Sequence, residues 1–348
     1  MKNIRLEKLQ NLIKHPVLIK KKENLLYLTG RSFMYGYLLV KKNGAVFFGD
    51  GLERIEGIES DFLKNIGQYV GPRETLEVFG EFTYAEVKYI KFKNPKLKVK
   101  VVIKHDPVDR LRAVKDGHEL ELIRTNMRMV EKVFAQVKKQ LKKKSWTETG
   151  LADFIKSAGF KLGAEDVSFP PIVASGPNAA VPHHVPSTKK LKAGESIILD
   201  FGFKYKGYCS DFTRTVFIKK VPAKLEAVYN QAEKAYWESM NFIGSGRGQS
   251  LGAGKIYQKA VDVLAEKKLD KYFIHSLGHG SGLEIHELPN LSPKSRDILQ
   301  KGMVFSIEPG VYIPKLSGVR IEDLVYLEES GAKRFISVPT KIEDNIIK

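Results

Sequence analysis

Four carboxylates and one imidazole lie in stretches of this sequence where apolar residues and glycines predict burial. The stretches read Ile-Ile-Leu-Asp200-Phe-Gly, Tyr-Cys-Ser-Asp211-Phe-Thr, Gly-His279-Gly, Phe-Ser-Ile-Glu308-Pro-Gly and Arg-Ile-Glu322-Asp. Ionised carboxylates are expensive to bury unless they are paired or bound to metal. A donor set of mostly oxygen with one nitrogen suits Mn, Co, Fe or Zn better than a metal that prefers thiolates. Because four of the five donors can bridge, the set is sufficient for two metal ions.

The spacing of the first two carboxylates predicts a β-hairpin. Residues 204–207 (Lys-Tyr-Lys-Gly) read as a turn with strand-like sequence on either side. In a hairpin centred between Tyr205 and Lys206, Asp200 and Asp211 face each other directly. Cross-strand partners have Cβ atoms ~4.5–5.5 Å apart, which suits carboxylates shared by two metals ~3.5–4 Å apart.

A second pair of carboxylates has the same symmetry. Glu308 and Glu322 are equally spaced about Lys315, which lies in a turn-like segment. Period-two alternation also places Arg320 on the same strand face as Glu322. One such pair could consist of acidic residues that cap a turn, but two pairs together with His279 predict a metal centre.

Histidines cluster around the same part of the sequence. His275, His279 and His286 lie within twelve residues, in a chain that has eight histidines. His183 lies in a polar loop punctuated by prolines, where a substrate-facing imidazole would be carried. An alternative for His275 is a structural histidine whose ring nitrogens are hydrogen-bonded within the protein. An alternative for His183 is a solvent-exposed loop residue without a function.

Length and pattern predict two domains. At 348 residues the chain is long for one core. The first third has short apolar runs, an Asn-Gly turn at 43–44 and an alternating segment at 97–103, which predict a small α/β unit. The expected division is 1–112 and 113–348.

Helices are expected in the second part of the chain. Asp116 and Glu119 have the spacing of a capping box, and apolar residues then recur every three or four positions as far as Leu141. Two further helices are expected around 224–240 and 255–268. The glycine-rich stretch at 244–248 lacks the strand and spacing of a phosphate-binding loop, so we expect a connector.

Charge and cysteine usage limit the partners and the compartment. The net charge is +18, but most of the basic residues are lysines, whereas base readout favours arginine. Nucleic acid is therefore not the expected partner, although binding to a polyanion stays open. Cys209 has no second cysteine to pair with, and no apolar run is long enough to cross a membrane. The absence of an apolar signal sequence completes the expectation of a cytoplasmic protein.

The motifs resemble those of a known family. Ser-Gly-Pro-Asn-Ala-Ala-Val-Pro-His, Ile-Leu-Asp-Phe-Gly, Tyr-Cys-Ser-Asp-Phe-Thr-Arg-Thr, Gly-His-Gly-Ser-Gly-Leu-Glu-Ile-His-Glu, Ile-Glu-Pro-Gly and Val-Arg-Ile-Glu-Asp occur in the order found in the Xaa-Pro peptidases. The chain resembles prolidases and the related aminopeptidases P over about residues 115–330. The resemblance implies an α+β protein with a C-terminal pita-bread catalytic domain, a smaller N-terminal α/β creatinase-like domain and a homodimer.

The resemblance also implies roles for individual residues. Asp200 would be a terminal ligand of one metal and His279 and Glu308 of the other, with Asp211 and Glu322 bridging both. His183 and His286 match substrate-side histidines, His275 matches a position near the substrate pocket, and Arg320 matches an arginine behind the ligands. Manganese is the first expectation for the metal, with Co, Zn or Fe as alternatives.

These roles predict hydrolysis of Xaa-Pro bonds, most readily in dipeptides. A hydroxide bridging the two ions would attack the carbonyl carbon, with Glu308 as general base and later as proton donor to the proline nitrogen. His286 would stabilise the oxyanion and His183 would hold or relay a proton. An aminopeptidase P acting on longer peptides is the alternative, and a catalytically silent binding module is a remote one because all five ligands are present.

Overall fold

The long amphipathic helix expected after Asp116 is present as α5 (Gly117–Lys143). Its N-terminus has the predicted capping box, because the Asp116 side chain accepts from the Glu119 backbone N–H and the Glu119 side chain accepts from that of Asp116. Among the recurring apolar residues, Ile123, Met127, Val130 and Val137 are fully buried. The 3.6-residue repeat therefore presents one continuous apolar face to the core.

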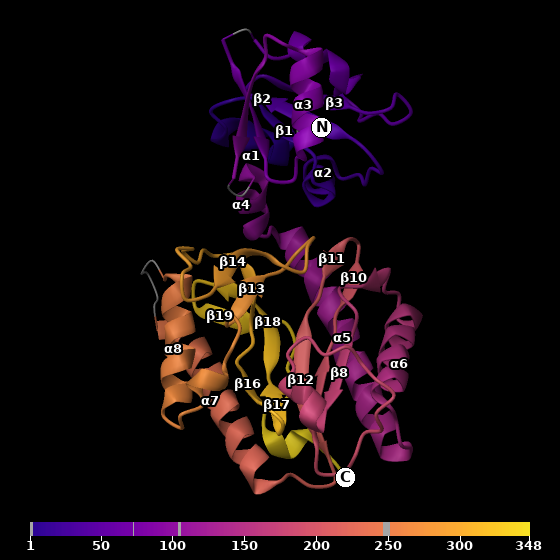
Figure 1. Ribbon diagram of the computed structural model, residues 1–348, viewed down its shortest axis with the longest axis vertical. Helices are drawn as coiled ribbons and strands as arrows, with labels where there is room; N and C mark the ends of the chain where they lie inside the picture. The colour runs from indigo at the N-terminus through magenta and orange to yellow at the C-terminus, as the bar shows by residue number, and fades with distance from the viewer. Residues whose placement is uncertain (1–2, 72, 104–105, 246–250) are drawn as a thin grey trace. The chain divides into compact units, whose positions relative to one another are not determined.

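The computed structural model describes residues 3–71, 73–103, 106–245 and 251–348. The chain forms two compact units, Met1–Arg112 and Ala113–Lys348 (Figure 1). Each unit has its own sheet and its own apolar core. Residues 246–248 of the predicted glycine-rich connector lie outside the described residues.

The N-terminal unit is built on a mixed sheet with the strand order β4-β3-β2-β1-β5-β6. The strands are β1 (Val17–Ile19), β2 (Tyr37–Lys41), β3 (Gly44–Phe48), β4 (Glu59–Asp61), β5 (Thr75–Phe79) and β6 (Lys98–Val102). The helices are α1 (Ile4–Leu12), α2 (Lys22–Thr29), α3 (Tyr84–Lys93), α4 (Pro107–Ala113), which reaches the boundary, and the 3-10 helix η1 (Leu63–Gln68). Buried Leu39, Phe48 and Val78 belong to its core.

The predicted strands of this unit are present. β2 and β3 form an antiparallel hairpin with Lys41 opposite Gly44, and the alternating segment at 97–103 contains β6. The apolar run at 24–30 is helical and belongs to α2, which ends at Gly30 in the left-handed conformation with φ 72°. Glycine suits this position because it has no Cβ to clash there.

The C-terminal unit contains a nine-stranded sheet among the described residues. Its strands are β8 (Ile172–Ser175), β9 (Ser196–Asp200), β12 (Phe212–Ile218), β13 (Gly278–Gly280), β14 (Glu287–Leu291), β15 (Val304–Ile307), β18 (Glu322–Glu328), β19 (Gly331–Arg334) and β20 (Ile346–Ile347). Shorter strands are β7 (Asp166–Val167), β10 (Phe203–Tyr205), β11 (Tyr208–Cys209), β16 (Gly310–Ile313) and β17 (Ser317–Arg320). The other helices are α6 (Glu148–Lys161), α7 (Ala223–Ser245), α8 (Ala253–Ala265) and the 3-10 helices η2 (Gly176–Ala180), η3 (Asp270–Tyr272) and η4 (Ile342–Asn345).

Two helix pairs flank the strands of this unit (Figure 1). α5 contacts β10 and β11, α6 contacts β8, and α7 and α8 contact β19 and β14 respectively. The predicted helices around 224–240 and 255–268 are α7 and α8. The apolar core includes fully buried Tyr229, Tyr236, Phe305 and Val325. This packing fixes the sheet, and with it the strand ends that carry the predicted ligands.

The predicted pairing of Asp200 directly opposite Asp211 is wrong. Asp200 faces Thr213, because the turn is centred between Lys206 and Gly207 rather than between Tyr205 and Lys206. Both turn residues have positive φ, 51° and 79°. Such a turn matches the twist of the two strands. Since residues two apart share a strand face, Asp211 is the diagonal neighbour of Asp200 on the same face.

The predicted register of the second hairpin is confirmed. Gly310 pairs with Arg320 across a turn centred on Lys315, and the ladder between β15 and β18 continues the same register, with Ile307 opposite Asp323. This register places Glu308 and Glu322 opposite each other, between the two ladders. Within the described ranges, no helix is both long and apolar enough to cross a membrane.

Candidate metal centre

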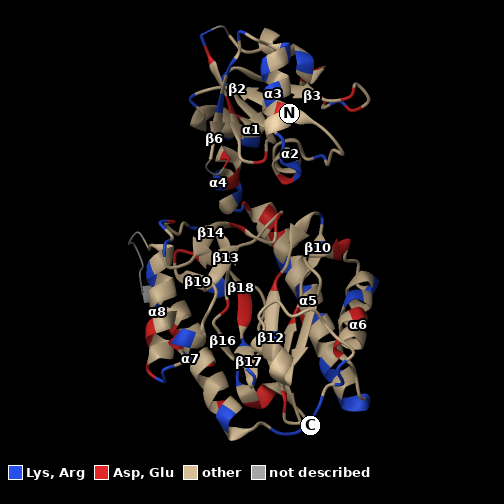
Figure 2. Ribbon diagram, in the orientation of Figure 1, with Lys and Arg blue, Asp and Glu red and all other residues tan. Residues whose placement is uncertain are grey.

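Five successive strands of the sheet, in the order β13-β15-β18-β12-β9, each carry one predicted ligand. In that order the residues are His279 within β13, Glu308 directly after β15, Glu322 at the start of β18, Asp211 directly before β12 and Asp200 at the end of β9. The strands of this unit are mostly uncharged, and an acidic segment of β18 stands out among them (Figure 2). The sheet thus gathers residues that are 122 positions apart in the chain.

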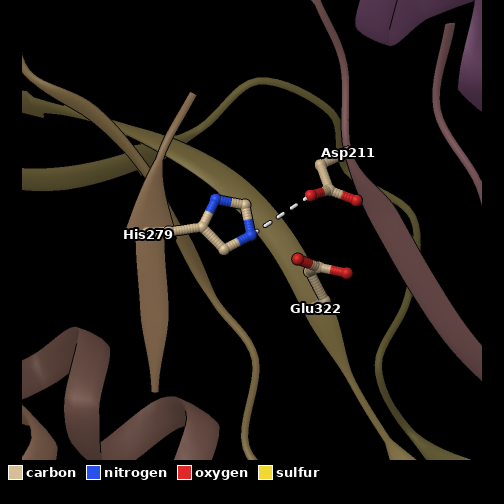
Figure 3. Close-up of side chains that lie close together, drawn as sticks. All are labelled: Asp211, His279 and Glu322. Atoms are coloured by element: carbon tan, nitrogen blue, oxygen red, sulfur yellow. Dashed lines mark ion pairs between the residues drawn. The ribbon is translucent and has the colours of Figure 1, made fainter. Parts of the chain in front are cut away.

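Asp211, His279 and Glu322 form the tightest group. Each offers a ligand atom, and these atoms all lie within 4.8 Å of one another. The three side chains point toward a common space (Figure 3). His279 Nε2 lies 3.5 Å from Asp211 Oδ2 and 3.4 Å from Glu308 Oε1. This arrangement of one nitrogen and several carboxylate oxygens is suited to a divalent metal.

The backbone around His279 fixes the imidazole in one orientation. Its ring Nδ1 lies 3.1 Å from the carbonyl oxygen of Gly280, which can only accept a hydrogen bond. Nδ1 is therefore the protonated nitrogen, and Nε2 presents its lone pair to the carboxylates. Burial, together with nearby His286, lowers the pKa of His279 to about 3, so the imidazole is neutral and able to bind metal.

Asp200 is held by Arg320 at one oxygen only. Arg320 Nη2 donates to Asp200 Oδ2, whereas Asp200 Oδ1 is buried and has no hydrogen-bond partner in the described part of the chain. Buried polar atoms without a partner are rare and call for an explanation. A metal ion bound to Oδ1 would supply one, and the donor set therefore fits a divalent cation.

Burial also makes the carboxylates hard to ionise without a cation. It raises the pKa of Asp200, and it raises the pKa values of Asp211 and Glu322 well above the usual range, with further increases from neighbouring carboxylates. The pKa of Glu308 rises to about 8 for the same reason. Divalent cations remove this repulsion, since they favour the ionised form of nearby acids.

Arg320 bonds to several protein groups behind the ligands. Besides Asp200 it donates to the Tyr312 hydroxyl at 2.6 Å, to Thr213 Oγ1 at 3.3 Å and to the Pro182 carbonyl at 3.3 Å. Thr213 in turn donates to Glu322 Oε2 at 2.6 Å. Arg320 is thus connected to Glu322 through Thr213, while its direct ion pair is with Asp200.

The predicted substrate-side histidines occupy different environments. His275 Nε2 lies 2.9 Å from the Tyr312 hydroxyl, and burial and the charge of Arg320 lower the pKa of His275 to about 4. The His286 ring stands edge-on to that of His279, with centroids 4.1 Å apart. Burial, followed by the nearby His183, lowers the pKa of His286. His183 itself is exposed.

Sequence reasoning missed the residues that hold the ligands in place. Thr213 could have been found, because it lies two positions after Asp211 and shares its strand face. Ser306 has the same signal, because it lies two positions before Glu308, whereas Tyr312 had no comparable signal. Ser306 accepts from the His279 backbone N–H at 3.0 Å and lies 3.2 Å from Glu308 Oε1, to which it donates.

Comparison with known proteins places the chain in a family. Residues 121–329 match metallopeptidase family M24. The chain belongs to this family. It is 33% identical to the Xaa-Pro dipeptidase of Pyrococcus furiosus over 341 residues, which are 95% of this chain and 94% of that protein. The prediction of a metallopeptidase from the motifs is therefore confirmed. This member of family M24 uses divalent metal.

Solved structures agree with this assignment. The prolidase from Pyrococcus horikoshii has a TM-score of 0.88 at 28% identity, covering 98% of this chain and all of that one (100%). An X-Pro aminopeptidase from Thermotoga maritima has a TM-score of 0.83 at 27% identity, covering 96% and 99%. The predicted α+β fold class, with a pita-bread catalytic domain and a smaller N-terminal domain, is confirmed.

Proposed function

We propose that this M24 enzyme hydrolyses Xaa-Pro dipeptides at a centre of two divalent metal ions. Manganese is the first choice, with Co, Zn or Fe as alternatives. The observation that carries the proposal is the delivery of five ligands by five neighbouring strands. The similarity to the Xaa-Pro dipeptidase of Pyrococcus furiosus supports the substrate class.

The order of the strands supports a division of the ligands between two ions. His279 and Glu308 come from β13 and β15 on one side, and Asp200 comes from β9 on the other. Glu322 and Asp211 come from β18 and β12 between them. We therefore assign His279 and Glu308 as the residues that would hold one ion, Asp200 as the residue that would hold the second, and Asp211 and Glu322 as carboxylates that both ions would share.

Two divalent ions held by these residues would supply Lewis-acid chemistry toward the scissile carbonyl and the attacking water. Glu308 accepts the proton of the attacking water and returns it to the leaving proline nitrogen. Its raised pKa, about 8, reflects burial and the negative charge of Asp200. Bound cations would favour the ionised form of Glu308, which is the form that accepts this proton.

The histidines act on the substrate side of this centre. His286 lies against His279, and we assign it to stabilising the negative charge that develops on the carbonyl oxygen. His183 is exposed on its loop and is assigned to holding or relaying a proton to the peptide. His275 Nδ1 lies 3.9 Å from Glu308 Oε2, and the ring of His275 is held by the Tyr312 hydroxyl. Arg320 orients Asp200 rather than the substrate, since its donors are directed at protein groups.

An Xaa-Pro aminopeptidase is the second candidate function. It is favoured by the structural similarity to the Thermotoga maritima X-Pro aminopeptidase. The two functions differ in whether the site accepts residues beyond proline. Hydrolysis of Ala-Pro and of Ala-Pro-Ala by Mn²⁺-loaded protein separates them: the dipeptidase cleaves Ala-Pro preferentially, and preferential cleavage of Ala-Pro-Ala would replace it with the aminopeptidase.

The same assay with a ligand variant tests the site. We expect Asp211→Ala to abolish hydrolysis and to lower the bound metal, because it removes a bridging carboxylate. Unchanged turnover would refute the site. We also propose that the enzyme is a cytoplasmic homodimer, which sizing of the purified protein and cell fractionation can test.

A further inference from the structure

A fully buried carboxylate outside the metal centre holds the loop that carries His183. Glu148 is the first residue of α6, and its side chain is completely inaccessible to solvent. Burying a carboxylate without a cation beside it is costly unless hydrogen bonds satisfy its oxygens. In Glu148 both oxygens are satisfied, and all the donors come from one segment of chain, 175–187.

The donors lie at both ends of that segment. Glu148 Oε1 accepts from the Ser175 backbone N–H at 2.9 Å, from Ser175 Oγ at 2.8 Å and from Asn178 Nδ2 at 3.1 Å. Oε2 accepts from Asn178 Nδ2 at 3.1 Å, His184 Nε2 at 2.9 Å, and the Ser187 backbone N–H and Oγ at 3.1 and 2.7 Å. One carboxylate thus closes the segment into a loop.

Between the held ends of the loop, Val181 and His183 are exposed, whereas Ala179 is buried. His183 is exposed, whereas the adjacent His184 is turned to Glu148. The Pro182 carbonyl, directly before His183, accepts from Arg320 Nη1 at 3.3 Å. The two neighbouring histidines therefore have different environments: His184 anchors the loop, and His183 is left available to a substrate.

We propose that Glu148 is a positioning residue for catalysis, which holds the 175–187 loop so that His183 faces the substrate. It touches neither substrate nor metal, and the inference rests on the proposed role of His183 in Xaa-Pro hydrolysis. An ionised carboxylate is required because it only accepts hydrogen bonds. In Glu148→Gln one oxygen becomes an NH₂ donor, and it would face either the donors from Ser175 or those from Ser187.

The test combines Glu148→Gln with His183→Ala in Mn²⁺-loaded protein. We expect Glu148→Gln to lower kcat for Ala-Pro about ten- to hundredfold, in line with the effect of misplacing a catalytic group by ~1 Å, at unchanged bound metal per chain. In the His183→Ala background the same change should have little further effect, because the two residues act as one unit. Asp153→Asn, an exposed carboxylate on the same helix, is the matched control.

A second variant and a second readout complete the test. Ser187→Ala removes one donor and leaves the carboxylate in place, so a several-fold loss of kcat coupled to His183 is expected even where Glu148→Gln folds poorly. The His183 ring resonance in metal-free protein with carbon-13-labelled histidine, assigned by its loss in His183→Ala, should shift in Glu148→Gln and not in Asp153→Asn.

Two results would overturn the inference: additive losses in the double variant, or an unshifted His183 resonance in Glu148→Gln. Failure of the proposed function has a different signature. If the unmodified Mn²⁺-loaded protein does not cleave Ala-Pro, the substrate assignment is wrong, while the resonance comparison still decides whether Glu148 positions His183.

Discussion

His183 differs from the metal ligands in being exposed and outside the ligand group. Its replacement should therefore affect the reaction more than the metal. We expect His183→Ala to lower kcat for Ala-Pro by about 10²- to 10⁴-fold, the range for a group that transfers a proton, with the bound metal per chain unchanged. Metal analysis of the same sample checks this. A parallel loss of metal would indicate a structural role instead.

Arg214 supports the strand that carries Glu322, although it is not one of the candidate ligands or substrate-side residues. It is fully buried, it pairs with Asp323 at 2.9 Å, and it donates to the Glu322 carbonyl at 2.7 Å. Removing Arg214 leaves the buried Asp323 carboxylate with Arg334, 3.0 Å away, and the loss of one member of a buried ion pair is strongly destabilising. We expect Arg214→Met to lower the free energy of unfolding by about 3–5 kcal/mol, measured by urea denaturation of metal-free protein. Exposed Arg128→Met is the control, and equal stability of the two variants would contradict the assigned role of Arg214.

Glu148 should make the stability of the loop depend on acid pH. Burial alone would raise its pKa, but hydrogen bonds from Ser187, His184, Ser175 and Asn178 outweigh burial and lower the pKa to about 2. A carboxyl group with a lower pKa in the folded state contributes stability above its unfolded pKa, near 4.5, and that contribution is lost as pH falls toward 2.

The corresponding measurement is the difference in unfolding free energy between the natural protein and Glu148→Gln. We expect this difference to be constant from pH 7 to about 5 and to shrink below about 4.5, where the unfolded chain takes up a proton more readily than the folded one. A difference that grows on acidification would contradict the assignment of an ionised Glu148.

At the scale of single elements, β13 brings His279 to the site because glycines lie on both sides of it. A Cβ at Gly278 would clash with the backbone oxygen of Ser306, and one at Gly280 with that of Leu288. We expect Gly278→Ala to push β13 away from β15, which weakens metal binding and lowers the melting temperature. Gly117→Ala, where nothing lies near the added methyl group, is the control. Metal affinity equal to that of the natural protein would contradict this account of β13.

The sequence predicted those features of the helices and hairpins that depend on residues close together in the chain. The capping box of α5 and the symmetric spacing about Lys315 are short-range features, and both are present. The turn of the first hairpin is centred one residue later than predicted, because Lys206 adopts a positive φ of 51°. Non-glycine residues rarely take that conformation, so the sequence Lys-Tyr-Lys-Gly did not predict where the turn is centred.

The motifs predict the candidate ligands, but they do not predict which distant residues contact them, even where period-two spacing marks a residue such as Thr213. Thr213 and Glu322 are 109 residues apart in the chain, and Glu148 is 39 residues from Ser187. No local period links such residues, since their contacts exist only once β12 pairs with β18 and α6 packs beside β8. The fold creates these supports, and sequence spacing alone does not reveal them.

At the scale of the whole molecule, one sheet of the C-terminal unit brings several carboxylates close together in a buried site. Its carboxylates are buried together, with raised pKa values, because the strand ends converge. Arg320 offsets part of this negative charge at Asp200, but most Lys and Arg of the chain lie on helices and loops (Figure 2). Divalent cations are the natural complement of the site, and their removal should abolish hydrolysis.

The most direct test is a metal titration of chelator-stripped protein, with Ala-Pro hydrolysis and bound metal per chain measured on the same samples. We expect no hydrolysis by the stripped protein, and activity that rises with added Mn²⁺ and reaches its maximum when two ions are bound per chain. Full activity in the stripped protein, or maximal activity with a single ion bound, would contradict a dinuclear centre held by Asp200, Asp211, His279, Glu308 and Glu322.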